Sequence, residues 1–190
     1  DGENLSDGGA YSGATAATLT IFEIAPGNAG TYAVVVSNSA GSETSSDATL
    51  TVIEPPLITA QPASQNLNAG SSAVFTVAAT GTAPLSYQWK KNGANLSDGG
   101  NVSGANSQTL TINNVLAASA GDYSVVVSNS AEDVPSAIAA LTVNDPHITS
   151  QPSSVTNASG TTAIFSVTVN GTELLTFQWK KDGSPLADGG

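Results

Sequence analysis

Short runs in which apolar and polar residues alternate dominate the chain, and each run predicts a strand with one buried face. Residues 73–79 and 85–90 are the clearest examples, with Phe75 and Trp89 on the apolar faces. Further runs of this kind cover 109–112, 123–127 and 139–143. Asn92-Gly93 predicts a tight hairpin turn, because both residues tolerate a positive φ. The only helical signal is one turn at 115–120, so the predicted class is all-β.

Three blocks of sequence repeat at a fixed spacing. DGENLSDGG begins at Asp1, NGANLSDGG at Asn92 and DGSPLADGG at Asp182, so the starts lie 91 and 90 residues apart. AGTYAVVVSN is repeated as AGDYSVVVSN, and AVFTVAATGTAPLSYQWKKNG as AIFSVTVNGTELLTFQWKKDG. A period of about 90 residues is the size of a small domain rather than of a solenoid unit. Each repeat is therefore predicted to have its own core.

Prolines mark the predicted boundaries between repeats. Aligned to the period, residues 56–143 form one complete domain, residues 1–53 the second half of a domain, and residues 146–190 the first half of another. The linkers, Glu54-Pro55-Pro56 and Asn144-Asp145-Pro146, are short and stiffened by proline. Each is followed by a segment (PLITAQPAS or PHITSQPSS) whose internal proline predicts an edge strand. We expect an extended string of domains with limited bending.

Composition and charge exclude several functions. Fifteen acidic residues stand against four lysines, so the net charge is -11 and the chain lacks the cations needed to bind nucleic acid. There is no cysteine and a single histidine, so we expect no enzyme activity, cofactor or transition-metal site. No apolar run approaches the roughly 18 residues of a membrane span, and the first residues have no features of a signal peptide.

Two motifs resemble the immunoglobulin-like domains of the I-set kind, in the cysteine-free form found in tandem in large bacterial surface and secreted proteins. One is YQWKKNG and FQWKKDG, which carry Trp89 and Trp179; the other is AGDYSVVVSN and AGTYAVVVSN, which carry Tyr123 and Tyr32. The resemblance implies tandem β-sandwiches and an extracellular or cell-surface location. It implies a core of Trp89, Tyr123, Val77 and Val125, in which the two valines occupy the positions of the family disulfide.

The candidate polar sites are weak. His147 is expected to pack at a domain junction, like its counterpart Leu57, and the adjacent Glu132-Asp133 is a poor acid/base pair. The Asp-Gly-Gly turns at Asp7, Asp98 and Asp188 offer too few ligands together for calcium, and turn chemistry explains them. Lys90-Lys91 and Lys180-Lys181 are expected to cover the tryptophans and meet the acidic surface rather than form isopeptide bonds. Sequons that could carry glycans occur at Asn4, Asn95, Asn101, Asn157 and Asn170.

The incomplete ends suggest head-to-tail assembly with other copies of the chain. Neither half can bury its apolar face alone, so we expect Trp179 and Val167 of one copy to contact Tyr32 and Val34 of the next. The hairpin at 182–190 would then duplicate the one at 1–9. A window cut from a longer covalent array would give the same sequence. The leading function is the shaft of an extracellular filament or surface fibre; an adhesin or glycan-binding array, and a passive spacer in a larger secreted protein, remain open.

Overall fold

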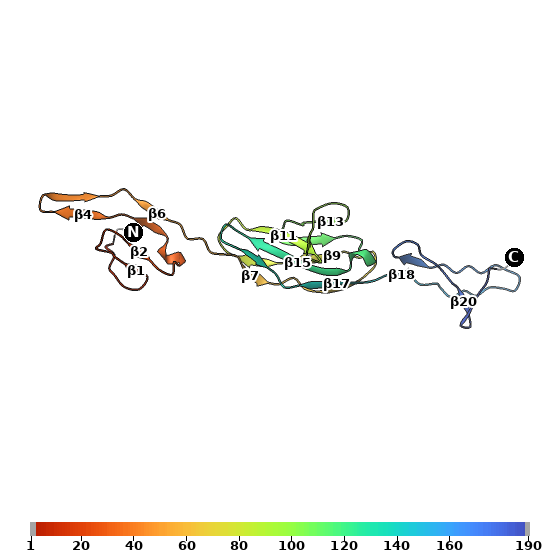
Figure 1. Cartoon of the computed structure of the whole chain (residues 1–190). Coiled ribbons are helices and arrows are strands. Elements are labelled where there is room, and N and C mark those ends of the chain that lie inside the picture. The colour runs from red at the N-terminus through yellow and green to blue at the C-terminus, as the bar shows by residue number, and fades with distance from the viewer. Residues whose placement is uncertain (1–2, 189–190) are drawn as a thin grey trace.

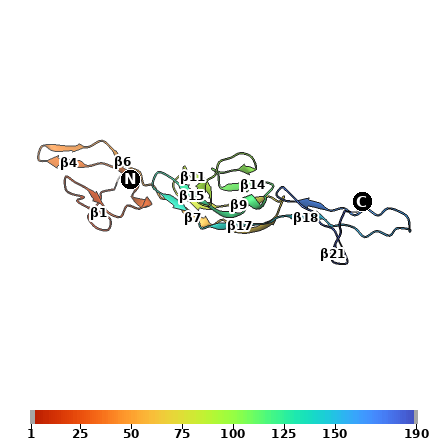
Figure 2. The same ribbon diagram turned by 45° about the vertical axis from the view of Figure 1, so that its right-hand side comes forward.

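The computed structural model describes residues 3–188, which form an elongated chain of strands with the two termini at opposite ends (Figures 1 and 2). In these residues the only helices are two 3₁₀ turns, η1 (Pro26–Asn28) and η2 (Ala117–Ser119). The all-β prediction is confirmed. The turn predicted within 115–120 is η2, and the hairpin predicted at Asn92-Gly93 is present, with φ of 50° and 82° at these residues.

The larger sheet of the central domain contains the Trp89 strand and the Tyr123 strand side by side. Its order is β12 (Ala94–Asn95), β11 (Ser86–Lys91), β15 (Gly121–Ser128), β17 (Ala139–Asn144) and β8 (Gln65–Asn68), with β16 (Asp133–Pro135) also paired to β15. Neighbouring strands are antiparallel except β17 and β8, which are parallel. Trp89 lies opposite Val125 in the register of β11 and β15.

The facing layer consists of two short sheets. One has the order β13 (Val102–Ser103), β14 (Thr109–Ile112), β9 (Ala73–Thr76), and the other pairs β10 (Ala78–Thr80) with β7 (Leu57–Ala60). The single strand predicted at 73–79 is therefore wrong. The strand is interrupted at Val77. Its N–H still donates to the carbonyl of Gln108, just before β14, whereas the residues after it pair with β7.

The internal proline of the segment PLITAQPAS, Pro62, was predicted to lie inside an edge strand, and it does not. Pro62 is not inside a strand but between β7 and β8, which belong to different sheets. A residue without an N–H cannot continue a ladder, so the chain crosses from one layer to the other at this point. Both strands lie at the edge of their sheet.

The two layers enclose one hydrophobic cluster. Phe75 from the smaller layer stacks on Tyr123 of the larger one, with 4.8 Å between ring centroids, and lies 6.1 Å from Trp89. The other buried members of the cluster are all aliphatic: Ala73, Val77, Leu110, Ile112, Val115, Val125, Val127, Ala139 and Leu141.

Each end segment contains only two-stranded sheets. In residues 3–53 the pairs are β1 (Tyr11–Ser12) with β2 (Thr20–Ile21), β3 (Gly30–Tyr32) with β6 (Ala48–Leu50), and β4 (Val35–Asn38) with β5 (Gly41–Thr44). In residues 146–188 they are β18 (His147–Ser150) with β19 (Thr168–Asn170), and β20 (Lys180–Lys181) with β21 (Ser184–Pro185). By the repeat, each segment holds strands equivalent to part of both layers of the central domain, but not the strands that complete either layer.

Candidate functional site

The central domain shows how one repeat closes its core. Trp89 and Val125 are fully buried, and Val77 and Tyr123 nearly so. The indole N–H of Trp89 donates to the carbonyl of Ser107 at 2.8 Å, and the hydroxyl of Tyr123 donates to the carbonyl of Ser119 at 2.7 Å. The second bond is the tyrosine corner of immunoglobulin-like sandwiches. Burial raises the pKa of Tyr123 to about 12, because it disfavours the charged phenolate.

The N-terminal segment keeps the local geometry of the same positions. Tyr32, the counterpart of Tyr123, donates its hydroxyl to the carbonyl of Asn28 at 2.6 Å. Val34 N–H donates to Ser45 Oγ at 3.0 Å, as Val125 N–H does to Ser136 Oγ at 3.0 Å. This half of the repeat therefore adopts the conformation that it has in a complete domain.

The C-terminal segment, which corresponds to the first half of the repeat, also keeps the local geometry of the central domain. Phe165 and Trp179 lie with their ring centroids 6.3 Å apart at 44°, compared with 6.1 Å and 42° for Phe75 and Trp89. The amide of Gln178 donates to the carbonyls of Trp179 and Leu186, as that of Gln88 does to Trp89 and Leu96. Each end segment is preorganised to pair with the complementary strands of a complete domain, which it does not itself contain.

In the end segments, the counterparts of the side chains that fill the core of the central domain are exposed. Trp179 is 42% exposed and Val34 49%, whereas their counterparts Trp89 and Val125 are 0% exposed. Phe165 is 50% exposed, compared with 1% for Phe75. Leu19, Ile24 and Val36 are likewise exposed counterparts of the fully buried Leu110, Val115 and Val127.

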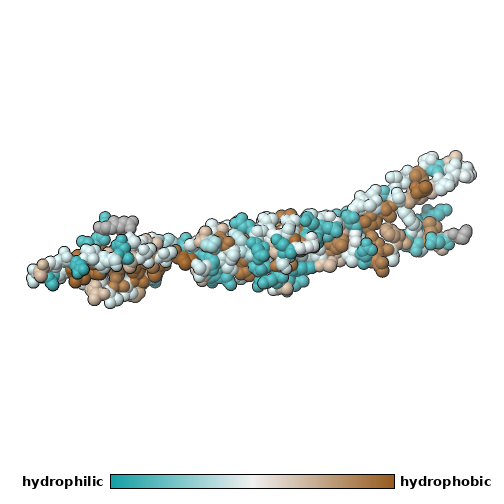
Figure 3. Space-filling model, turned by 90° about the horizontal axis from the view of Figure 1, so that it is seen from above, coloured by the Kyte–Doolittle hydropathy of each residue, from teal (hydrophilic) through white to brown (hydrophobic). Residues whose placement is uncertain are grey.

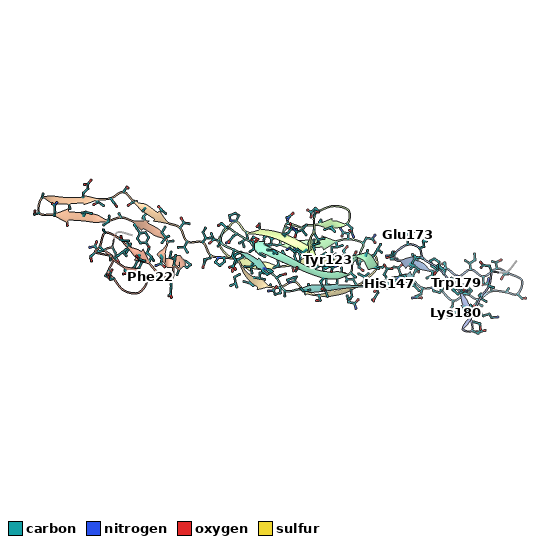
Figure 4. All side chains as sticks on the ribbon, viewed as in Figure 1. Phe22, Tyr123, His147, Glu173, Trp179 and Lys180 are labelled. Atoms are coloured by element: carbon teal, nitrogen blue, oxygen red, sulfur yellow. The ribbon has the colours of Figure 1, made fainter. Side chains whose placement is uncertain are left out.

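Together these side chains form two apolar faces at opposite ends of the chain. In Figure 3 the brown, apolar side chains gather on both end segments, and the C-terminal one divides into two arms. A cavity of about 950 Å³ opens there beside Phe165, Phe177, Trp179 and Leu186. Figure 4 places Phe22 and Trp179 at opposite ends, so the halves do not close on each other within one chain. Of the four residues predicted to meet between copies, Val34 and Trp179 are exposed, and Tyr32 and Val167 are partly covered.

The candidate polar residues have structural partners. Asp7 and Asp98 each accept an N–H, from Ala14 and Ala105, at 2.7 Å, so their carboxylates hold their own loops. In the third copy of this motif, the two glycines after Asp188 lie outside the described residues. Residues 3–188 contain no group of three or more acidic, histidine or cysteine side chains that could hold a metal ion. In the same residues no helix is long and apolar enough to cross a membrane.

Two expectations about single side chains need correction. Leu57, the counterpart of His147, does not pack at a junction but is 65% exposed, because β7 is an edge strand whose alternate face points to solvent. Lys91 lies over the ring of Tyr123, with Nζ 6.0 Å from the centroid, but its ammonium donates to the carbonyl of Ala118 rather than to an acidic side chain.

The carboxylate of Asp145, in the second linker, joins the central domain to the segment that follows it. Asp145 Oδ1 accepts the N–H of Thr172 at 2.9 Å, and Oδ2 accepts the Thr172 hydroxyl and the N–H of Ala117, both at 2.6 Å. These bonds, first those from Thr172 and then that from Ala117, hold the pKa of Asp145 below its ordinary value. No sequence signal pointed to this contact, since its partners lie 27 and 28 residues away.

Comparisons with known proteins agree with this architecture. Residues 55–129 match the family described as immunoglobulin domain, and residues 146–190 match the immunoglobulin I-set domain. Over 98% of its length the chain resembles an I-band fragment of titin, I67–I69, with a TM-score of 0.64 and 22% identity, covering 68% of that structure. This likeness shows the fold.

Relatives of known sequence are long proteins. Muscle M-line assembly protein unc-89 of Caenorhabditis elegans is 34% identical over 88% of the chain, and Roundabout homolog 1 of Mus musculus is 32% identical over 87%. Endoglucanase C of the bacterium Cellulomonas fimi is 32% identical over 61%. The chain spans only 2%, 11% and 10% of their respective lengths. Immunoglobulin-like domains are therefore present in this all-β chain, one of them of the I-set kind, and its relatives include immunoglobulin-domain proteins.

Proposed function

We propose that the chain is a structural repeat of an extracellular filament or surface fibre, in which the end segments of successive copies join head to tail. Residues 146–188 of one copy and 3–53 of the next then form one sandwich, here named the joint domain. One observation carries the proposal: the exposed apolar side chains of the end segments are the counterparts of the buried core of the central domain. The role is mechanical and involves no catalysis or cofactor.

The register of the central domain specifies the contacts of the joint domain. Trp89 lies opposite Val125, so Trp179 of one copy faces Val34 of the next. Phe75 lies opposite Leu110, so Phe165 faces Leu19. Because the two halves lie at opposite ends, each copy offers one half to each neighbour, and a contact of this heterologous kind propagates as a fibre.

Burial of the apolar faces provides the driving force. Fully burying one large apolar side chain contributes about 1.5 to 3 kcal/mol, and about half of that remains available for side chains that are already half covered. Association costs about 4 to 15 kcal/mol in lost freedom, so several such side chains must act together. The retained local geometry of both halves keeps the additional ordering cost low. Assembly should therefore depend steeply on protein concentration and on single core positions.

Sedimentation velocity of purified protein over a range of concentrations tests the proposal. Val34→Asp should keep the chain monomeric, because it places a charge in the joint core. Val74→Asp is the matched control: Val74 is 48% exposed but faces solvent in the complete domain, so this variant should still assemble. An unmodified chain that stays monomeric at all concentrations, or equal effects of both substitutions, would contradict the proposal.

Mixing two blocked variants gives a sharper test. Val34→Asp leaves a usable C-terminal half, and Trp179→Asp leaves a usable N-terminal half. Each variant alone should be monomeric, whereas the mixture should form a 1:1 dimer that grows no further. A mixture that remains monomeric would mean that the halves are not complementary.

A spacer within a longer protein is the second candidate, supported by the match to part of an endoglucanase. In that case the missing halves come from neighbouring residues of the same polypeptide. The length of the intact protein, measured by mass spectrometry from its source, separates the two. A chain far longer than 190 residues favours the spacer.

A further inference from the structure

The two linkers of the chain attach their domains differently. Asp145 lies between β17 of the central domain and β18 of the next segment. Its carboxylate accepts hydrogen bonds from Ala117 of the central domain and from Thr172 of the next segment. One side chain in the linker therefore binds both of the bodies that the linker connects.

A second contact closes this junction. Asn170 of the C-terminal segment lies against the backbone of Gly70 in the central domain, where a β-carbon would come within 2.0 Å of the Asn170 Nδ2. Gly171 fits closely against the linker itself, since a β-carbon there would lie 2.9 Å from Asp145 Oδ1, just as one at its counterpart Gly81 would lie 2.9 Å from the carbonyl oxygen of Pro55. The loop 170–172 thus rests directly on the end of the central domain, around the carboxylate.

The first linker lacks the carboxylate contact. Glu54 binds the domain that follows it through its backbone: its N–H donates to Thr82 Oγ1 at 2.8 Å, and its carbonyl accepts the N–H of Thr82 at 3.1 Å. In the described residues no hydrogen bond joins 3–53 to 56–143. Figure 1 shows the chain crossing this junction as a single extended stretch between β6 and β7.

The sequence explains why the contact at Asp145 is not repeated at Glu54. Ala117, which donates the N–H from the preceding domain, is replaced by Pro26 in the first segment. Proline has no N–H, so this donor is missing for a carboxylate at the first linker. The first linker also has one residue more, Pro55.

We propose that Asp145 fixes the orientation of the central domain relative to the segment after it, so that the chain alternates one rigid junction, at Asn144–Pro146, with one compliant junction, at Glu54–Pro56. In the filament proposed above, on which this last consequence rests, every second junction bends. The hydrogen bonds of Asp145 to Ala117 and Thr172, here named the clasp, form within a single chain and can be tested without assembly.

Distance measurements between spin labels test the proposal, and the absence of cysteine allows specific labelling. All chains carry Val34→Asp, which removes the proposed assembly from the experiment. Cysteines replace exposed residues: Ser103 in the central domain with Thr168 for the second junction, or with Thr44 for the first. The width of each distance distribution, measured by pulsed electron paramagnetic resonance, reports the freedom of the junction.

Two variants remove the clasp in different ways. Asp145→Ala removes the carboxylate, and Ala117→Pro removes one donor while keeping the fold, because Pro26 occupies the same position at the start of η1. Both should broaden the Ser103–Thr168 distribution toward the width found across the first junction. Glu54→Ala, the matched control, should leave the Ser103–Thr44 distribution unchanged. A distribution that stays equally narrow in Asp145→Ala would overturn the proposal, and so would broadening by Glu54→Ala.

Discussion

Replacing the two tryptophans one at a time should change the stability of the chain by very different amounts, because one lies in a complete core and the other in an incomplete one. Trp89 and Trp179 occupy the same position of the repeat, but the first is 0% exposed and the second 42%. Trp89 also donates its indole N–H to Ser107, and its ring packs against Phe75. The same substitution to alanine therefore removes very different sets of interactions at the two positions.

The expected magnitudes follow from burial. Removing a fully buried aromatic side chain costs about 3 to 5 kcal/mol, because burial is lost and a cavity remains. Loss of the hydrogen bond to Ser107 adds about 1 kcal/mol. A domain of this size is stable by about 5 to 15 kcal/mol, so Trp89→Ala should leave a folded but much weakened central domain. Trp179→Ala should change the stability of a monomeric chain by less than about 1 kcal/mol.

Urea unfolding followed by far-ultraviolet circular dichroism measures both effects, because this signal reports mainly on the backbone strands. The measurements are made in the Val34→Asp background so that the chain stays monomeric. A loss below about 1 kcal/mol for Trp89→Ala would show that the core is wrongly assigned. An equal loss for Trp179→Ala in the monomer would show that the C-terminal segment has a closed core of its own.

The remaining predictions concern alkaline pH and one loop. Because the pKa of Tyr123 is raised in the folded state, its contribution to stability is complete below pH 10 and is lost as pH rises toward about 12. The free energy of unfolding should therefore fall in this window, and Tyr123→Phe should reduce that slope in urea titrations. Gly104→Ala should cost about 1 to 3 kcal/mol, because φ is +80° and a β-carbon would lie 2.0 Å from the carbonyl oxygen of Thr109. Gly27→Ala meets no atom within 4 Å and should be neutral in the same assay.

Local patterns predicted the elements that depend on neighbouring residues. The alternation around Trp89 and Tyr123, the Asn92-Gly93 turn and the single turn at η2 are all present. Each depends on side-chain spacing or on backbone preferences within a few residues. The repeat also predicted that each end segment is half of a domain, because its sequence aligns with one half of the complete central domain.

Contacts between distant parts of the chain were not predictable in the same way. The interruption at Val77 depends on Gln108, and the clasp at Asp145 depends on Ala117 and Thr172. A pattern of apolar and polar positions carries no information about which backbone N–H meets a given carbonyl or carboxylate. The exposed position of Leu57 was missed for a related reason, since the pattern does not show that β7 is an edge strand.

The geometry of the two halves also bears on how a fibre of such chains would form. Tyr32 keeps its corner bond, and Phe165 and Trp179 keep their packing angle, although each segment lacks the strands that complete its layers. These contacts are local in sequence, so they can form before two chains meet. Docking then brings together two surfaces that are already shaped, and little backbone must be ordered at that step. A fibre assembled in this way would depend mainly on burial of apolar side chains, with no disulfide and no metal ion needed to close its joints.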